Sequence, residues 1–202
     1  MTFTKAVRVF SVFGILGFLF TIAHFILVVS TGGADSIILN YLDITAWIFI
    51  MFGMIAAYFS RIEDLGKLGF IGIIITLFAI AWTIGIVSVH SFSFPIIHEL
   101  SSSMDLANVA ENALPSPIRE AEITSSILMF AGPALFGLSV FLYNKLTRWP
   151  GVLLILAGVS SVLDSYVDIL GLIAYLGTPV AIFWLCIKAL KIDDSASSPS
   201  NS

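Results

Sequence analysis

Basic residues are confined to a few short segments of this chain, and their placement constrains the fold more than any other sequence feature. Eight of the nine Lys and Arg residues lie in four segments, which occupy every second gap between long apolar runs, the two chain ends included. In multi-pass membrane proteins, Lys and Arg accumulate in short loops on the cytoplasmic side. The alternation therefore predicts six membrane spans with both termini in the cytoplasm. The eight residues are Lys5, Arg8, Arg61, Lys67, Lys145, Arg148, Lys188 and Lys191.

The composition indicates that lipid surrounds much of this chain. Hydrophobic residues make up 58% of the 202 positions and charged residues only 11%, whereas an average soluble domain has about 25% charged residues. A soluble fold of this length could not bury so much apolar surface. Only helices and closed barrels satisfy their backbone hydrogen bonds in hydrocarbon, and continuous rather than alternating apolar runs favour helices. We expect an all-α membrane protein, a compact bundle of six transmembrane helices in contact with the lipid bilayer.

Six apolar runs are long enough for membrane spans, which require about 20 residues each. The first run follows Lys5 and Arg8, as in a signal peptide, but it is long and lacks a small-residue cleavage site, so we predict a retained anchor. One transmembrane domain, residues 1–191, precedes a Ser-rich tail, 192–202, that we expect to be disordered. The predicted spans are residues 7–30, 41–60, 68–90, 120–143, 150–167 and 171–190, with an outer cap loop at 91–119.

The acidic residues collect on the side opposite to the clustered bases. The predicted inner segments hold eight bases and four acids, a net charge of +4, and the outer segments hold Arg119 and nine acids, a net charge of −8. No segment carries a basic patch large enough for nucleic acid, so we exclude nucleic acid as a partner. A second copy of the chain and another membrane protein stay open as partners.

Two predicted hairpins share a sequence pattern. Residues 51–69 and 135–151 each begin with an apolar-Phe-Gly triplet, pass through an aromatic and basic turn, and end at a glycine. Both would run from the outside to the inside and back, so a duplication would give a parallel repeat. A true duplication and a chance similarity between two apolar segments both stay open.

The outer cap loop, 91–119, contains signals for a short helix. Ser102 and Asp105 resemble the two ends of a capping box, and Pro115 would end the helix that they begin. We expect this segment to cover the outer mouth of the bundle as a lid-like cap.

Prolines interrupt two predicted spans, Pro133 in the fourth and Pro179 in the sixth. Proline removes a backbone hydrogen bond and bends a helix, so we predict a kink at each position. In transporters such interruptions expose backbone groups to a substrate. Neighbouring helices also satisfy the freed groups in proteins that transport nothing. We favour the packing explanation, and the transport explanation stays open.

Ionisable residues at membrane depth are costly and are therefore candidates for function. Those of this chain lie in the outer half of the predicted bundle. Asp164 and Asp168 are four residues apart and share one helix face. Either they form the outer turn between spans five and six, which we favour, or Asp164 is a buried proton or cation site. The candidates for ligand or cation binding are His24, Asp43, His90, Asp164 and Asp168.

These imidazole and carboxylate side chains would suit a divalent metal if the fold brought them together. However, the chain lacks the ligand spacing of motifs such as HExxH, and each residue has a simpler explanation. Asp43 would cap a helix, His90 would lie at the membrane surface, and His24 would form an interhelical hydrogen bond. We therefore predict no cofactor, with a divalent metal as the open alternative.

Short motifs at the two basic hairpins add a resemblance. Residues 58–61 lead into Leu65-Gly66-Lys67-Leu68-Gly69-Phe70-Ile71-Gly72, and Arg148-Trp149-Pro150-Gly151-Val152-Leu153-Leu154 begins the fifth predicted span. These stretches are similar to the corresponding hairpins of uncharacterised bacterial six-span integral membrane proteins, many of which place a histidine where this chain has His24. Pro150 departs from the small residue that is usual there. The resemblance implies the six-span architecture and the cell inner membrane of a bacterium, and it implies no activity.

No catalytic or transport signature is present in the sequence, which has no Ser-His-Asp set, no phosphate-binding glycine loop and no cysteine pair. The single cysteine, Cys186, should pack as an apolar side chain near the inner end of the last span. Our leading hypothesis is a non-enzymatic membrane protein, either an accessory subunit or a binder of a small apolar or cationic ligand. A small transporter or substrate-binding membrane subunit and an intramembrane metal-dependent hydrolase are the alternatives.

Overall fold

The described part of the chain is helical throughout and contains no strand. The computed structural model describes residues 2–32, 36–100, 116–143, 148–163 and 168–191. The all-helical prediction is confirmed for these residues. The helices are α1 (Phe3–Ser30), α2 (Ile37–Phe59), α3 (Ile62–Ser88), the π-helical turn η1 (Val89–Ser93), α4 (Phe94–Leu100), α5 (Ile118–Tyr143), α6 (Trp149–Leu163) and α7 (Asp168–Ala189).

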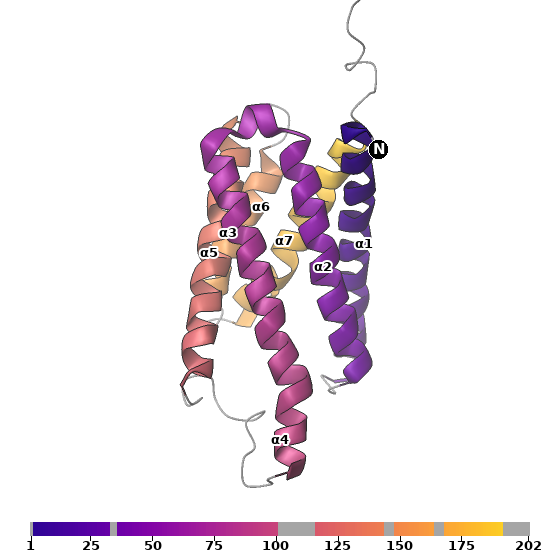
Figure 1. The fold of residues 1–202 in the computed structure, drawn as a ribbon, viewed down its shortest axis with the longest axis vertical. Coiled ribbons are helices and arrows are strands. Elements are labelled where there is room, and N and C mark those ends of the chain that lie inside the picture. Colours follow the sequence, from indigo (N-terminus) through magenta and orange to yellow (C-terminus); the bar gives the residue numbers. More distant parts are fainter. Residues whose placement is uncertain (1, 33–35, 101–115, 144–147, 164–167, 192–202) are drawn as a thin grey trace, which may run out of the picture.

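Six helices form a closed bundle in which neighbours run in opposite directions (Figure 1). Helix α1 packs against α2 and α7, α2 packs against α3, and α3 packs against α5. Helix α6 completes the ring between α5 and α7. The start of α1, the α2–α3 turn and the end of α7 therefore lie at one end of the bundle, and α4 projects from the opposite end (Figure 1).

Five helical segments are long and apolar enough to cross a membrane: α1, α2, the continuous rod Ile62–Ile97, α5 and α7. Helix α6 has 15 residues, which corresponds to about 22 Å at 1.5 Å per residue. It is shorter than the roughly 30 Å hydrocarbon core of a bilayer. The chain is thus a multi-pass membrane protein, and five of the six predicted spans reach full length within the described residues.

Large apolar side chains cover the outside of the bundle. Leu19 on α1, Phe78 on α3 and Ile127 on α5 are 50%, 54% and 58% exposed. Monomeric soluble proteins rarely expose apolar patches larger than a few hundred Å². Contact with lipid accounts for this exposure, because acyl chains are as apolar as these side chains.

The predicted outer loop, 91–119, begins too early. Residues 91–93 belong to η1 and residues 94–100 form α4, so the third helical rod extends beyond the predicted end at residue 90. Ser and Pro in this stretch indicate a loop, but the rod continues through Pro95, which follows the π-helical turn η1. The predicted capping residues Ser102 and Asp105, like the tail 192–202, lie outside the described residues.

Glycines set the closest approaches between helices. A Cβ added at Gly14 of α1 would lie 2.6 Å from the Gly53 Cα of α2 and 2.5 Å from Cys186 Sγ of α7. Cys186 is fully buried, as expected for a packing role, and its thiol donates to the Gly53 carbonyl over 3.5 Å. Three helices therefore meet at this point because none of them carries a side chain larger than a thiol there.

The α3–α5 contact is built in the same way. A Cβ added at Gly72 would lie 2.7 Å from the Phe136 Cα, and one added at Gly132 would lie 2.7 Å from the Thr76 Cα. Further out along α3, a Cβ added at Gly85 would have no neighbouring atom within 4 Å. The two helices are thus in backbone contact at Gly72 and leave open space at Gly85.

We predict opposite effects for two alanine substitutions on α3. Gly72→Ala should lower the free energy of unfolding by about 2 kcal/mol, because the added methyl group forces α3 and α5 apart. Gly85→Ala, the matched control, should leave stability unchanged or raise it by up to about 1 kcal/mol, because Ala favours the helix and meets no atom. Reversible unfolding in mixed micelles measures both. Equal effects of the two substitutions would contradict the close packing at Gly72.

Candidate functional site

Side chains from three helices form a hydrogen-bonded cluster, His24–Tyr175–Asp43. The Nδ1 atom of His24 lies 2.7 Å from the Tyr175 hydroxyl, which donates to Asp43 Oδ1 over 2.8 Å. The direct distance from His24 Nδ1 to Asp43 Oδ1 is 3.7 Å, too long for a good hydrogen bond. Tyr175 therefore connects the histidine and the aspartate.

The hydrogen-bond directions define the state of the cluster. Tyr175 has one hydroxyl proton and gives it to Asp43, so its oxygen can only accept from His24. His24 must then carry a proton on Nδ1, whether or not Nε2 is also protonated. The Asp43 carboxylate thus accepts its hydrogen bond from another helix, α7.

The cluster lies about two helical turns inside the bundle. His24 is six residues before the end of α1, Asp43 is six residues after the start of α2, and Tyr175 is seven residues after the start of α7. At 1.5 Å per residue these separations are about 9–10 Å. The side chains of His24 and Asp43 are 17% and 14% exposed, so most of their surface is shielded by the protein.

Pro179 lies in α7 one helical turn after Tyr175. It lies inside the helix and has no N–H, so the helical acceptor four residues earlier, the Tyr175 carbonyl, receives no bond from it. Pro133 removes the equivalent bond to Met129 in α5. Both helices continue through their prolines. The interruption in α7 therefore coincides with the residue that carries the central hydroxyl of the cluster.

His90 belongs to a different site. It lies in η1, and its Nε2 atom is 2.9 Å from Glu122 Oε1 on α5. A π-helical turn is rare and often occurs at functional sites, because the extra residue per turn redirects the side chains. The Glu122 side chain is 13% exposed and that of His90 is 37% exposed.

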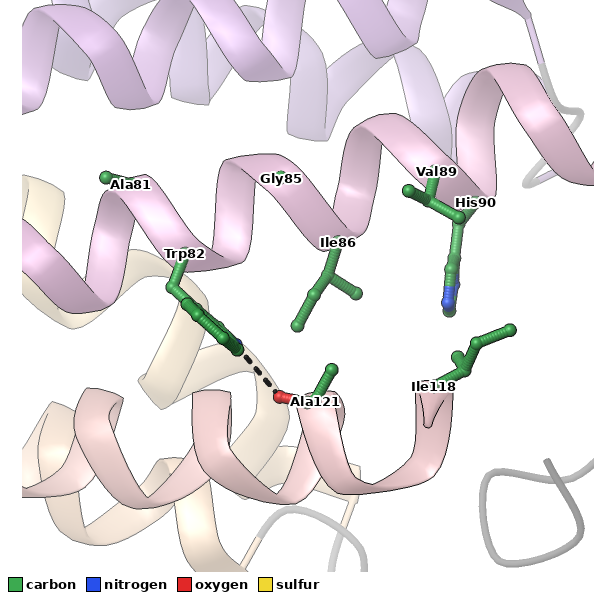
Figure 2. A pocket seen from close by; sticks show the side chains of 8 residues that line it. All are labelled: Ala81, Trp82, Gly85, Ile86, Val89, His90, Ile118 and Ala121. Carbon is green, nitrogen blue, oxygen red and sulfur yellow. Dashed lines mark hydrogen bonds between the residues drawn. The ribbon is translucent and has the colours of Figure 1, made fainter. Parts of the chain in front are cut away.

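An apolar groove between α3 and α5 is lined by His90, the partner of Glu122 (Figure 2). Its volume is about 330 Å³. The indole N–H of Trp82 donates to the Ala121 carbonyl over 3.0 Å, and Thr83 and Ser125 share a hydrogen bond of 2.7 Å beneath it. These bonds connect the two walls. The lining residues are Ala81, Trp82, Gly85, Ile86, Val89, His90, Ile118 and Ala121.

The predicted site residues thus separate into three groups. His24 and Asp43 meet, His90 pairs elsewhere, and the expected cap role of Asp43 is wrong because Ser36 precedes α2 and Asp43 lies inside it. Asp168 opens α7, and Asp164 lies outside the described residues. The choice between an outer turn at Asp164 and Asp168 and a buried proton or cation site at Asp164 stays open.

Two contributing residues were missed from the sequence. Tyr175 was overlooked because a tyrosine in a span usually anchors at the membrane surface. Its position four residues before Pro179 was the available signal. Glu122 lies near the start of α5, where an acid is expected without any functional role because that end of a helix is positive. In the described ranges, no three His, Cys, Asp or Glu side chains lie close enough together to hold a metal ion.

Comparison with protein-family models, with curated proteins and with solved structures gives no match to this chain. The resemblance to bacterial six-span proteins stays a prediction. The groove and the cluster are the two features of the described residues that point to a function.

We predict that Tyr175→Phe lowers the free energy of unfolding by about 1–2 kcal/mol, because it removes two interhelical hydrogen bonds and little volume. Tyr41→Phe is the matched control, since Tyr41 lies near the start of α2 and is 59% exposed. Unfolding of both variants in mixed micelles gives the comparison. A Tyr175→Phe protein as stable as the control would show that the cluster contributes nothing to helix association.

Proposed function

We propose that this protein binds a small cationic amphiphile within the membrane. The apolar body of the ligand lies in the α3–α5 groove, and its cationic head pairs with Glu122. The observation that carries the proposal is an otherwise apolar groove lined by His90, whose Nε2 atom lies 2.9 Å from the Glu122 carboxylate. An apolar cavity with a few convergent polar groups is the usual form of a small-molecule site.

The size of the groove favours a single alkyl chain or a compact ring system. Its volume of about 330 Å³ is at the lower end of the range of roughly 300–1,000 Å³ for ligand pockets. Open space at Gly85 separates the walls, and Trp82 closes one end through its bond to Ala121. The π-helical turn of η1 directs the His90 imidazole toward α5, as Figure 2 shows.

The charge distribution favours a cationic head over an anionic one. Glu122 is mostly shielded from solvent and contacts His90, which lines the groove, and the carboxylate keeps its negative charge while the imidazole is neutral. An amine can form a charge-assisted hydrogen bond to this carboxylate. The outer segments carry a net charge of −8, and a negative surface raises the local concentration of cations.

We further propose that the basic end of the bundle faces the cytoplasm of a bacterium, with α6 as the sixth span. The support is that Arg8, Arg61, Arg148 and Lys188 come from helix ends that lie at the same end of the bundle. Bases concentrate on the cytoplasmic side of membrane proteins. The groove then opens in the outer half of the membrane. Because the groove includes neither Pro133 nor Pro179, the proposal does not extend to transport.

A duplication of the two hairpins stays a prediction. In the suggested alignment Gly53 corresponds to Gly137, but Gly53 contacts Gly14 of α1, whereas Gly137 contacts Gly151 of α6. Gly53 therefore contacts a helix outside its own hairpin, whereas Gly137 contacts the second helix of its own hairpin. A parallel repeat would require that the two hairpins diverged in packing after duplication.

Cysteine labelling tests the orientation. An impermeant maleimide added to intact cells should label Glu120→Cys, at the groove end of α5, and not Glu63→Cys, at the α2–α3 turn. Both positions are exposed, and the native Cys186 is fully buried, so the background should be low. Labelling of Glu63→Cys alone would contradict the proposed orientation and indicate the opposite one.

Quenching of Trp82 tests the ligand site. Dodecylamine brominated on its tail should quench full-length protein in nanodiscs with a saturable component, and Trp82→Phe should abolish that component. Gly85→Phe should weaken it at least tenfold by filling the groove, whereas Ile74→Phe, on the lipid-facing side of α3, should not.

Glu122→Gln separates charge from shape in the same assay. Amine binding should weaken about tenfold, or about 1.4 kcal/mol. Binding of the uncharged dodecanol with the same brominated tail should stay unchanged. Quenching that is linear in amine concentration and insensitive to Gly85→Phe would refute the site.

A further inference from the structure

We propose that the His24–Tyr175–Asp43 cluster is a proton-binding site, separate from the α3–α5 groove, in which one excess proton is shared between His24 and Asp43 through Tyr175. The three side chains form a continuous path of two short hydrogen bonds, 2.7 Å and 2.8 Å long. A path of this kind can move a proton without any movement of the helices.

The transfer balances at each atom. In the loaded state, imidazolium His24 donates its Nδ1 proton to the Tyr175 oxygen while Tyr175 passes its hydroxyl proton to Asp43 Oδ1. The Nδ1–H bond and the original O–H bond break, and a new tyrosine O–H bond and a carboxylic acid O–H bond form. Tyr175 ends as a neutral phenol, His24 as a neutral imidazole with its proton on Nε2, and Asp43 as a neutral acid. Tyr175 then donates to His24 Nδ1, and the protonated Asp43 donates to the Tyr175 oxygen.

The surroundings favour uptake of a proton. Without the excess proton the cluster has a net charge of −1, and a shielded carboxylate in a membrane bundle is costly unless it is neutralised. No Lys or Arg lies in the outer halves of α1, α2, α6 and α7 within the described residues. His24 is therefore the cationic partner that these helices supply to Asp43. With one proton bound, the cluster becomes neutral overall.

The other titratable groups of the packed helices are distant or already paired. Lys5, Arg8, Tyr58, Cys186 and Lys188 belong to the inner halves of their helices, and α6 carries no ionisable side chain over Trp149–Leu163. In the outer halves, Tyr41 packs against Phe92, His90 pairs with Glu122, and Asp168 is the first residue of α7.

Labelled histidine and aspartate reveal the shared proton directly. Full-length protein with ¹⁵N-histidine and ¹³C-aspartate in nanodiscs is titrated by solid-state NMR, and His24→Asn assigns the His24 signals among the three histidines. We expect His24 Nδ1 to stay protonated above the transition, and His24 and Asp43 to respond together in one transition, as coupled groups do. Responses at separate pH values, or a His24 tautomer with its proton only on Nε2 above the transition, would overturn the proposal.

Two variants separate proton sharing from structure. Tyr175→Phe should split the joint transition into independent responses, and Tyr41→Phe should leave it intact. Asp43→Asn keeps an acceptor for the Tyr175 hydroxyl but removes the charge, so His24 should keep its Nδ1 proton while the joint transition disappears. A joint transition that survives Tyr175→Phe would contradict a path through the tyrosine.

Discussion

Hydrocarbon contains no water, so each polar group in this bundle has to find its partner within the protein, and most of the structure depends on that constraint. Helices satisfy the backbone. Buried hydroxyls bond to their own helix, as Thr21 does to the Gly17 carbonyl over 3.0 Å and Thr76 does to the Gly72 carbonyl over 2.7 Å. Carboxylates and imidazoles cannot be satisfied in this way, so they are paired between helices.

Close packing and polar pairing depend on the same small residues. Gly17 accepts the Thr21 hydroxyl and also lets α2 approach, because a Cβ there would lie 2.8 Å from the Ile50 nitrogen. That approach of α1 and α2 brings His24 and Asp43 within reach of one tyrosine on α7. The glycine contacts in the middle of the bundle therefore set the geometry of the cluster, which lies nearer the end of the bundle where α1 finishes.

The groove follows from the opposite situation. Helices α3 and α5 are in contact at Gly72 and Gly132, but at Gly85 no atom would meet an added Cβ. The helices leave open space there, and Trp82 and the His90–Glu122 pair connect them across the gap. The cluster is a polar junction closed by hydrogen bonds, whereas the groove is an apolar space with a polar end. They therefore suit different ligands, a proton and an amphiphile.

Part of the candidate site could be predicted because ionisable residues are conspicuous in apolar runs. His24 and Asp43 were identified for this reason, and both lie in the cluster. Tyr175 and Glu122 have ordinary explanations at their positions in the sequence, and their roles depend on which helix lies opposite. The extension of the third rod beyond residue 90 was missed because a π-helical turn accommodates a stretch whose composition indicates a loop.

The sequence by itself determined the lipid environment and the helical class, because these follow from hydropathy within short segments of chain. The tertiary structure decided which polar groups meet, that Tyr175 joins His24 to Asp43, and that a groove opens beside Gly85. Those outcomes depend on distances between helices that are far apart in sequence. Backbone contacts at glycines set these distances, and no local pattern encodes them.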